Sequence, residues 1–191
     1  IYRGSHWFAN GESQSGSGST LASTARIRKA LPEFLLRREI CSIFDAGCGD
    51  FNWMRAVDVN ILYIGGDIVP TLVDHLSAEF TSPLRRFMVI DITSDVPPKV
   101  DLILCREVLF HLSNANVMAA LRRFRRSQSK FLLTTLDREV GSNVDISDGD
   151  QRSLNLSLPP FNLPPPLEMF DDAENVDHRS LALWPIDDLP V

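Results

Sequence analysis

The sequence predicts a three-layer α/β domain with a doubly wound, mainly parallel sheet. Apolar runs of strand length alternate along the chain with segments of helical periodicity. The runs at 42–45, 61–67 and 87–92 each close on an acid, at Asp45, Asp67 and Asp91. Because the carboxyl ends of parallel strands meet at one edge of a sheet, we expect these three side chains to lie together beside a ligand.

The first run leads into the sequence D-A-G-C-G-D and then Phe51-Asn52. This pattern predicts a strand, a tight turn and the start of a helix. Gly47 and Gly49 have no Cβ, so we expect the backbone to come close to a ligand and to direct N–H groups at it. An ordinary strand, turn and helix without a ligand is the alternative.

Charge favours one class of ligand at this turn. A dinucleotide site would have a third glycine where Asn52 stands, and Asp45 and Asp50 would repel a pyrophosphate. A ligand with an ammonium and a sulfonium group, such as S-adenosylmethionine, fits the same carboxylates. Asp67 follows the turn by about 20 residues, where an acid accepts the ribose hydroxyls in doubly wound nucleotide sites. A solvated loop aspartate is the alternative there.

Composition limits the partners and the compartment. The 191 residues have the size of one domain, and the hydrophobic share of 44% is ordinary for a globular protein. The net charge of −6 argues against a nucleic-acid partner. No apolar run has the length of a membrane span, and the cysteines form no C-x-x-C pair, so we expect a cytoplasmic protein. Cys48, Cys105 and His111 lack a fourth ligand at a familiar spacing, so we expect no metal.

Residues 1–19 carry aromatic residues, among them Trp7, followed by a serine–glycine tract. The tract is either a flexible linker or the hinge of a lid that closes over the ligand, with Trp7 at the substrate. A helix capped by Ser19 or Thr20 is expected next, and it opens a single domain at residues 20–191.

The run at 100–105 is followed by Arg106, Glu107 and His111, which we expect to project from the strand end toward the reacting group. Arg106 and His111 are the catalytic candidates. His111 is the natural general base because its ordinary pKa is closest to neutrality. A histidine that only packs beneath the next helix, and an ordinary ion pair of Arg106 with Glu107, are the alternatives.

The remaining elements alternate less regularly. Pro70 opens one expected helix, and Ser113 or Asn114 caps another. Residues 130–135 and 180–186 predict two more strands. Between these two strands, residues 137–179 are rich in Asp, Asn, Ser and Pro and predict an irregular excursion on the substrate side. Arg152 and Asn155 suit a substrate-binding wall there, with a flexible excursion as the alternative.

Over residues 20–136 the chain resembles class I S-adenosylmethionine-dependent methyltransferases. The motifs that carry the resemblance are D-A-G-C-G-D-F-N-W-M, Y-I-G-G-D-I-V and C-R-E-V-L-F-H-L-S, and together they are closest to a poorly characterised bacterial subgroup. The resemblance implies a Rossmann-like, seven-stranded sheet with an antiparallel last strand. Phe51 departs from the family pattern because a third glycine is usual there, and its ring is a candidate wall for the cofactor.

The resemblance also assigns roles to residues. It implies that Asp45, Gly47 and Gly49 surround the methionine part of the cofactor and that Arg106 and His111 face the methyl group. The other implied cofactor contacts are Asp67 and Ile68 near the ribose and Asp91 and Ile92 at the adenine.

The predicted reaction is methyl transfer to an oxygen or nitrogen of a small molecule or sugar. A cofactor-binding module without turnover and a nicotinamide-dependent reductase are the alternatives.

Overall fold

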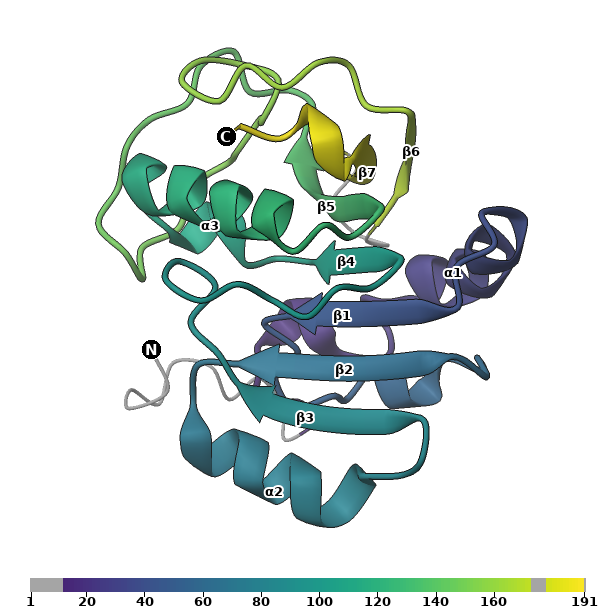
Figure 1. Ribbon diagram of the computed structural model, residues 1–191. Helices are drawn as coiled ribbons and strands as arrows, with labels where there is room; N and C mark the ends of the chain where they lie inside the picture. Colours follow the sequence, from purple (N-terminus) through teal and green to yellow (C-terminus); the bar gives the residue numbers. More distant parts are fainter. Residues whose placement is uncertain (1–11, 173–177, 191) are drawn as a thin grey trace.

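The computed structural model describes residues 12–172 and 178–190, which form one seven-stranded sheet with the order β3-β2-β1-β4-β5-β7-β6 (Figure 1). The strands are β1 Ser42–Ala46, β2 Leu62–Asp67, β3 Arg85–Val89, β4 Leu102–Cys105, β5 Phe131–Asp137, β6 Glu168–Asp171 and β7 Arg179–Pro185. Strands β1 to β5 pair in parallel, whereas β7 runs antiparallel to both β5 and β6. The predicted sheet and its antiparallel last strand are confirmed.

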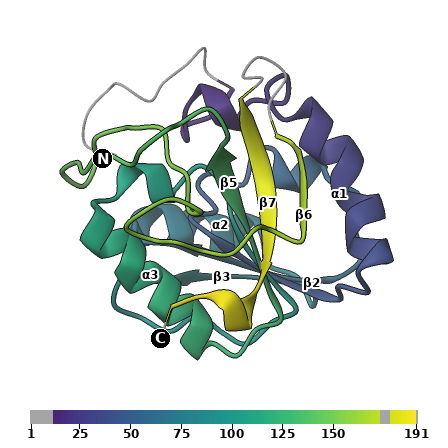
Figure 2. The same cartoon turned by 90° about the horizontal axis from the view of Figure 1, so that it is seen from above.

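Helices cover both faces of the sheet. Helices α1 (Ala25–Arg37) and α2 (Pro70–Phe80) lie on one face and α3 (Asn114–Arg126) lies on the other (Figures 1 and 2). The buried residues of α3 recur at the spacing of one helix face, and they are Val117, Ala120, Leu121 and Phe124. The chain therefore has the predicted three layers.

Strand β4 shows why the centre of the sheet is stable. Leu102 and Leu104 point into the core beneath α1 and α2, whereas Ile103 and Cys105 point into the core beneath α3. All four side chains are fully buried. A strand buried on both faces has an almost continuous apolar sequence, and each buried Leu or Ile contributes about 1.5–3 kcal/mol.

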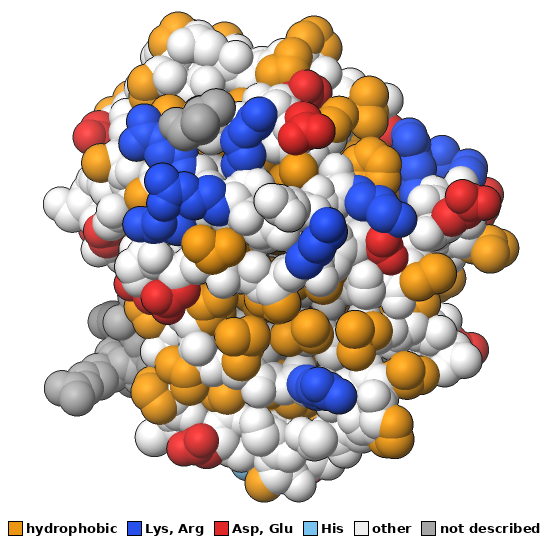
Figure 3. Space-filling model, in the orientation of Figure 1, with side chains coloured by type: hydrophobic (Ala, Val, Ile, Leu, Met, Phe, Trp, Pro, Cys, Tyr) orange, Lys and Arg blue, Asp and Glu red, His pale blue; other side chains and the backbone are white. Residues whose placement is uncertain are grey.

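Two expected crossovers contain no α-helix. The helix expected after the glycine turn is a single 3-10 turn, Met54–Ala56, because few residues remain before β2 starts at Leu62. Residues 90–101, between β3 and β4, contain only turns, and Pro97 and Pro98 interrupt any helix there. The α3 side of β2 and β3 is therefore uncovered. Met88 is 36% exposed there, and Figure 3 shows hydrophobic side chains gathered below the basic ones over α3.

The boundaries of two other elements differ from the expectation, and those of two more agree with it. Strand β3 ends at Val89, so Asp91 lies beyond its tip. Helix α1 begins at Ala25 after the N-cap residue Thr24, because Ser17–Ser19 form a separate 3-10 turn. Of the two candidate caps of α3, Ser113 takes the role, and its hydroxyl accepts the N–H of Asn116 at 3.3 Å. Helix α2 begins at Pro70 as predicted.

Strand β6 lies inside the stretch that was expected to be irregular. It has four residues and alternates between half-buried and exposed positions, a weak pattern for a strand. Its antiparallel pairing with β7 and the ion pairs of Glu168 with Arg37 and Arg38 hold it against the C-terminal end of α1. Within the described residues, no helix is long and apolar enough to cross a membrane.

Candidate active site

A cavity of about 740 Å³ opens at the carboxyl edge of the sheet, beside the tips of β1, β2 and β4. It lies where ligands bind in doubly wound folds. The residues expected to bind the cofactor or act in catalysis that line this cavity are Asp45, Gly47, Gly49, Asp67, Ile68, Asp91, Ile92, Arg106 and His111. The strands therefore bring the candidates from four separate segments into one site.

At the glycine turn the backbone passes close to a neighbouring side chain, and the N–H groups of the turn bond within the protein. Gly47 has φ +83°, and a Cβ there would lie 2.5 Å from Cγ2 of Val108. The N–H groups of Gly47 and Cys48 donate to the carbonyl of Gly66 at 2.8 and 3.0 Å, and that of Gly49 donates to Asp67 at 3.2 Å. The expectation that the turn directs its N–H groups at a ligand was therefore wrong, because the neighbouring strand already uses these donors.

Phe51 keeps the backbone that a glycine would have. Its φ is +59°, in the left-handed region that favours glycine. The ring is 2% exposed and lies 5.0 Å from Tyr63 and 5.3 Å from Phe87 between ring centroids, with the guanidinium of Arg85 above it. The ring points into the core beneath α2 and does not line the cavity. Aromatic packing therefore offsets the backbone strain, and the expectation that the Phe51 ring is a wall for the cofactor is wrong.

Two buried carboxyl groups face the cavity. Asp45 is 3% exposed and accepts the hydroxyl of Tyr63 at 2.7 Å. Burial outweighs this hydrogen bond and raises the pKa of Asp45 to about 7. Asp67 accepts the N–H groups of Gly49 and Val69, and burial raises its pKa as well. Charged carboxylates are costly in this site, so a cationic ligand would stabilise them.

The far end of the same edge is more open. The Oδ1 atom of Asp91 accepts both the N–H and the hydroxyl of Thr93, at 2.9 and 2.7 Å, in a local turn. Ile92 is 9% exposed, whereas Ile68 is 59% exposed. The two isoleucines give this part of the cavity apolar walls that suit a flat ring.

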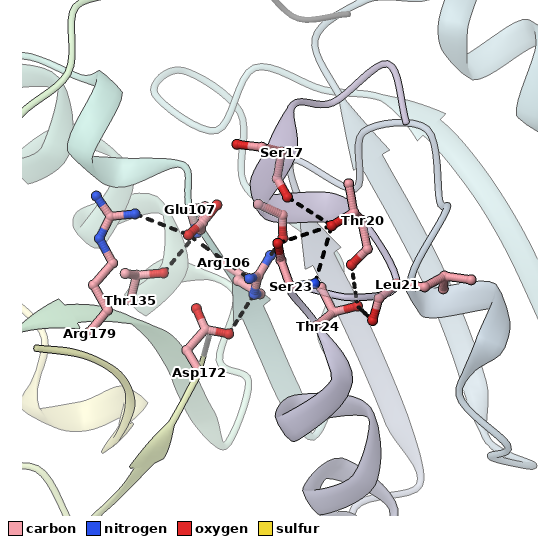
Figure 4. A network of polar contacts seen from close by, with 11 residues as sticks. Ser17, Thr20, Leu21, Ser23, Thr24, Arg106, Glu107, Thr135, Asp172 and Arg179 are labelled. Atoms are coloured by element: carbon pink, nitrogen blue, oxygen red, sulfur yellow. Dashed lines mark hydrogen bonds and ion pairs between the residues drawn. The ribbon is translucent and has the colours of Figure 1, made fainter. Parts of the chain in front are cut away.

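Arg106 is held in a buried network that joins distant parts of the chain (Figure 4). Its Nε lies 2.6 Å from Oδ1 of Asp172, which is fully buried, and its Nη1 donates to the carbonyl of Gly18 at 2.9 Å. Its Nη2 is buried without a hydrogen-bond partner. Nε and Nη1 of Arg106 therefore bind other parts of the chain, and Nη2 can still donate hydrogen bonds to a ligand.

Glu107 occupies a strained position at the tip of β4. Its φ is +56°, and its N–H donates to Oγ1 of Thr135 at 2.8 Å. Its carboxylate lies 3.2 Å from Nη1 of Arg179 and 3.9 Å from Nη2 of Arg106. The expected pair of Arg106 with Glu107 is thus the longer of two contacts. Strained residues gather at functional sites, and Glu107 lines the cavity as expected, although the sequence assigned it no role.

His111 presents one ring nitrogen as a base. It lies at the end of the 3-10 turn Leu109–His111, and its Nδ1 is 2.8 Å from the carbonyl oxygen of Asp150. A carbonyl only accepts hydrogen bonds, so the neutral ring has its proton on Nδ1 and its lone pair on Nε2. Burial lowers the pKa of His111, which keeps the ring neutral at physiological pH.

Comparison with known proteins identifies the fold. No family model and no curated protein matches the sequence. Among solved structures, magnesium protoporphyrin IX methyltransferase from Synechocystis with bound S-adenosylmethionine has a TM-score of 0.61 at 14% identity, over 83% of this chain and 77% of that one. A methyltransferase from Clostridium acetobutylicum has a TM-score of 0.60 at 11% identity, over 84% and 90%. Human N-acetylserotonin methyltransferase gives 0.57 at 14%, over 82% and 54%.

This chain has the class I S-adenosylmethionine-dependent methyltransferase fold.

The residues expected on the substrate wall of this methyltransferase fold lie elsewhere. The guanidinium of Arg152 donates to the carbonyl of Val144 at 2.9 Å, and the N–H of Asn155 donates to Asn143. Neither Arg152 nor Asn155 lines the cavity. Both make hydrogen bonds within the loop and stabilise it instead. Trp7 lies outside the described residues.

Other residues take the place of that wall, and sequence reasoning did not single them out. From the expected excursion, Asp148, Gly149, Gln151 and Arg179 line the cavity. From the serine–glycine tract, the segment 14–19 lines it too. The aspartates of the excursion belong to a polar, proline-rich stretch in which no spacing marks the residues that turn inward. Within the described residues, no group of three or more His, Cys, Asp or Glu could hold a metal ion.

Proposed function

We propose that this protein is a methyltransferase that uses S-adenosylmethionine to methylate an oxygen or nitrogen of a small molecule or sugar. The observation that carries the proposal is the pair of buried carboxyl groups, Asp45 and Asp67, at the carboxyl edge of a methyltransferase fold. Buried carboxylates need a compensating charge or hydrogen bonds, and this cofactor carries a sulfonium, an ammonium and a ribose diol.

The residues present fit the cofactor. Asp45 suits the ammonium group, and Asp67 suits the two ribose hydroxyls because its oxygens accept hydrogen bonds. The unpartnered Nη2 of Arg106 suits the carboxylate of the methionine part. Ile68 and Ile92 suit the faces of the adenine, with Asp91 at its edge. When bound, the cofactor supplies a methyl group that is already activated by the positive sulfur.

The protein's own residues then position the acceptor and remove its proton. Nε2 of His111 takes the proton of an acceptor hydroxyl, whereas an amine that is already neutral needs no base. Glu107, held by Arg179, accepts a hydrogen bond from a second polar group of the acceptor. The segment 14–19 forms one wall and keeps water from the site. We therefore assign most of the rate enhancement to positioning and desolvation.

The shape and charge of the cavity favour a small, polar acceptor. Its volume of about 740 Å³ lies in the range of small-molecule sites and must hold the cofactor as well. The polar side chains of Asn116, Asp148 and Gln151 line the cavity near His111 and suit the hydroxyl or amino groups of a sugar. Carbon remains an alternative acceptor atom, because a carbon methyltransferase, CurJ, is among the structures with this fold.

The test begins with binding. Isothermal titration calorimetry with S-adenosylmethionine and S-adenosylhomocysteine should show one site, and thermal stability should rise with ligand concentration. A dinucleotide serves as the control and should not stabilise the protein. Release of S-adenosylhomocysteine is then followed with a panel of sugars, amines and phenols. Stabilisation by the dinucleotide alone would favour the reductase, and cofactor binding without transfer to any acceptor would favour the binding module.

A further inference from the structure

Asp50 and Asn52 follow the glycine turn but do not line the cavity. They contact the segment Glu12–Ser19, which lies across the cavity and which we call the strap. The strap residues from Gln14 to Ser19 are part of the cavity wall. Asp50 and Asn52 are therefore placed to act on a ligand only through the strap.

Asp50 exchanges two hydrogen bonds with the strap. Its Oδ2 accepts the N–H of Gln14 at 2.6 Å, and its own N–H donates to Oγ of Ser15 at 2.8 Å. A bond to a carboxylate is charge-assisted and stronger than one between neutral groups. This reciprocal pair fixes the first half of the strap to the turn.

Asn52 fixes the two ends of the strap. Its side chain is 3% exposed, and its Nδ2 donates to the carbonyl of Ser19 at 3.0 Å and to Oε1 of Glu12 at 3.1 Å. The same Glu12 oxygen accepts the N–H of Leu21 at 2.6 Å. A third attachment is the hydrogen bond that Nη1 of Arg106 donates to the carbonyl of Gly18. Figure 4 shows Arg106 near Ser17 of the strap.

Polar contacts rather than packing hold the strap. Residues 12–20 read E-S-Q-S-G-S-G-S-T and include no hydrophobic side chain. Segments with few buried apolar contacts open at a lower free energy than the core around them. Removal of one or two hydrogen bonds should therefore shift the opening equilibrium strongly, without unfolding the domain.

We propose that Asp50 and Asn52 are positioning residues that latch the strap over the bound cofactor, and that release of this latch is the step by which the cofactor enters and leaves. The inference rests on the proposed cofactor binding. It assigns a role to Asp50, whose charge would repel the pyrophosphate of a dinucleotide, and to Asn52, which stands where a dinucleotide site has a glycine. It favours a lid over a flexible linker as the interpretation of the tract.

Stopped-flow fluorescence with S-adenosylhomocysteine tests the latch in wild type, Asp50→Asn and Asn52→Ala. Because opening precedes both entry and exit, both the association and the dissociation rates should rise in the variants, by about tenfold for loss of one charge-assisted bond. Hydrogen exchange at the amide of Gln14 should accelerate in parallel. Asp74→Asn, on an exposed part of α2, is the matched control and should leave both rates unchanged.

Each alternative outcome has a distinct signature. If wild type binds the ligand and both variants show the same association and dissociation rates as wild type, the latch alone is refuted. A faster dissociation with an unchanged association rate would make the strap a fixed wall and also refute it. Wild type that binds neither S-adenosylmethionine nor S-adenosylhomocysteine would refute the proposed function, and the latch with it. Glu12→Ala, altered on the strap side, replaces Asn52→Ala if thermal unfolding shows that Asn52→Ala is unstable.

Discussion

Asp45 links the fold to the chemistry of the site. Its carboxyl group is buried near the end of β1 and accepts one hydrogen bond from Tyr63, and burial nevertheless raises its pKa to about 7, so that much of it is protonated near neutral pH. Burial of this carboxylate is costly, and a ligand with a positive charge would offset the cost. Asp67 is also buried and would also be stabilised by a ligand, and its oxygens already accept hydrogen bonds from the turn.

The affinity for S-adenosylmethionine should depend on pH through Asp45. Burial raises the pKa of Asp45 to about 7, so below that pH a proton must leave before the carboxylate can meet a cation. The affinity should therefore strengthen as pH rises toward that value, by at most about tenfold per pH unit. Calorimetry across this range measures the effect. Asp45→Asn is the control for titration of the ligand itself, and an identical profile in both proteins would contradict the prediction.

His111→Gln should separate binding from transfer. Loss of a general base slows transfer by about 10²- to 10⁴-fold, whereas the affinity for S-adenosylhomocysteine should stay close to that of wild type. In wild type the transfer rate should fall as pH drops through the pKa of His111, which burial holds below its ordinary 6.5. Equal losses of affinity and rate in the variant would show that the histidine has a structural role instead.

At the scale of elements, the excursion between β5 and β7 stabilises the N-terminus of α3. Asp148 accepts the N–H of Ser113 at 2.6 Å and contacts the side chain of Asn116, and Asp145 accepts the N–H of Asn114 at 2.7 Å. These carboxylates cap the N-terminus of α3 from more than 30 residues away along the chain, where the helix dipole favours negative charge. The cap also carries Asp148 and Gly149 to the cavity wall.

Acid should weaken this cap. Hydrogen bonds from Ser113 lower the pKa of Asp148 from 3.8, so its contribution to the free energy of unfolding is present above that value and is lost as pH falls through the lowered pKa. Because the group is largely exposed, we expect Asp148→Asn to cost less than about 1 kcal/mol at pH 7. In denaturant unfolding, the difference between the two proteins should disappear as pH falls below the lowered pKa of Asp148. A difference that persists there would exclude the charge as the cause.

At the scale of the whole molecule, one sheet separates two hydrophobic cores, and the site turn is anchored in only one of them. Phe51 and Trp53 join the turn to the core beneath α1 and α2. The other core, beneath α3, includes Leu154, Leu156, Phe161 and Leu163 of the excursion. The stability of the site should therefore depend more on the α1 and α2 side.

Substitution of Phe51 should reveal both its packing and its strain. Phe51→Ala should lower the free energy of unfolding by about 3–5 kcal/mol, because a buried ring is lost. Phe51→Gly should be about 1 kcal/mol more stable than Phe51→Ala, because glycine adopts the observed φ of +59° without strain. Denaturant unfolding measures both. Leu36→Ala, at an 81% exposed position, is the control and should change little. The reverse order of Gly and Ala would refute the strain.

Local chemistry made the strands, the acids at their ends and the glycine turn predictable. Apolar runs with period two, a Pro70 that suits the first turn of a helix and a Gly47 that tolerates positive φ are properties of short segments. They placed all the cofactor candidates within one cavity. The missed strand β6 and the absent helix after the glycine turn depended on neighbours, since four alternating residues become a strand only beside β7.

By itself, then, the sequence determined the fold class, most of the strands and the acids at their ends, because these follow from periodicity and turn chemistry within a few residues. Only the tertiary structure decided that Arg106 pairs with Asp172, 66 residues away, and with Gly18, 88 residues away. It likewise decided that the strap is hydrogen-bonded to Asp50 and Asn52. Such contacts join polar groups far apart in the chain, and no local pattern specifies which partner satisfies which donor.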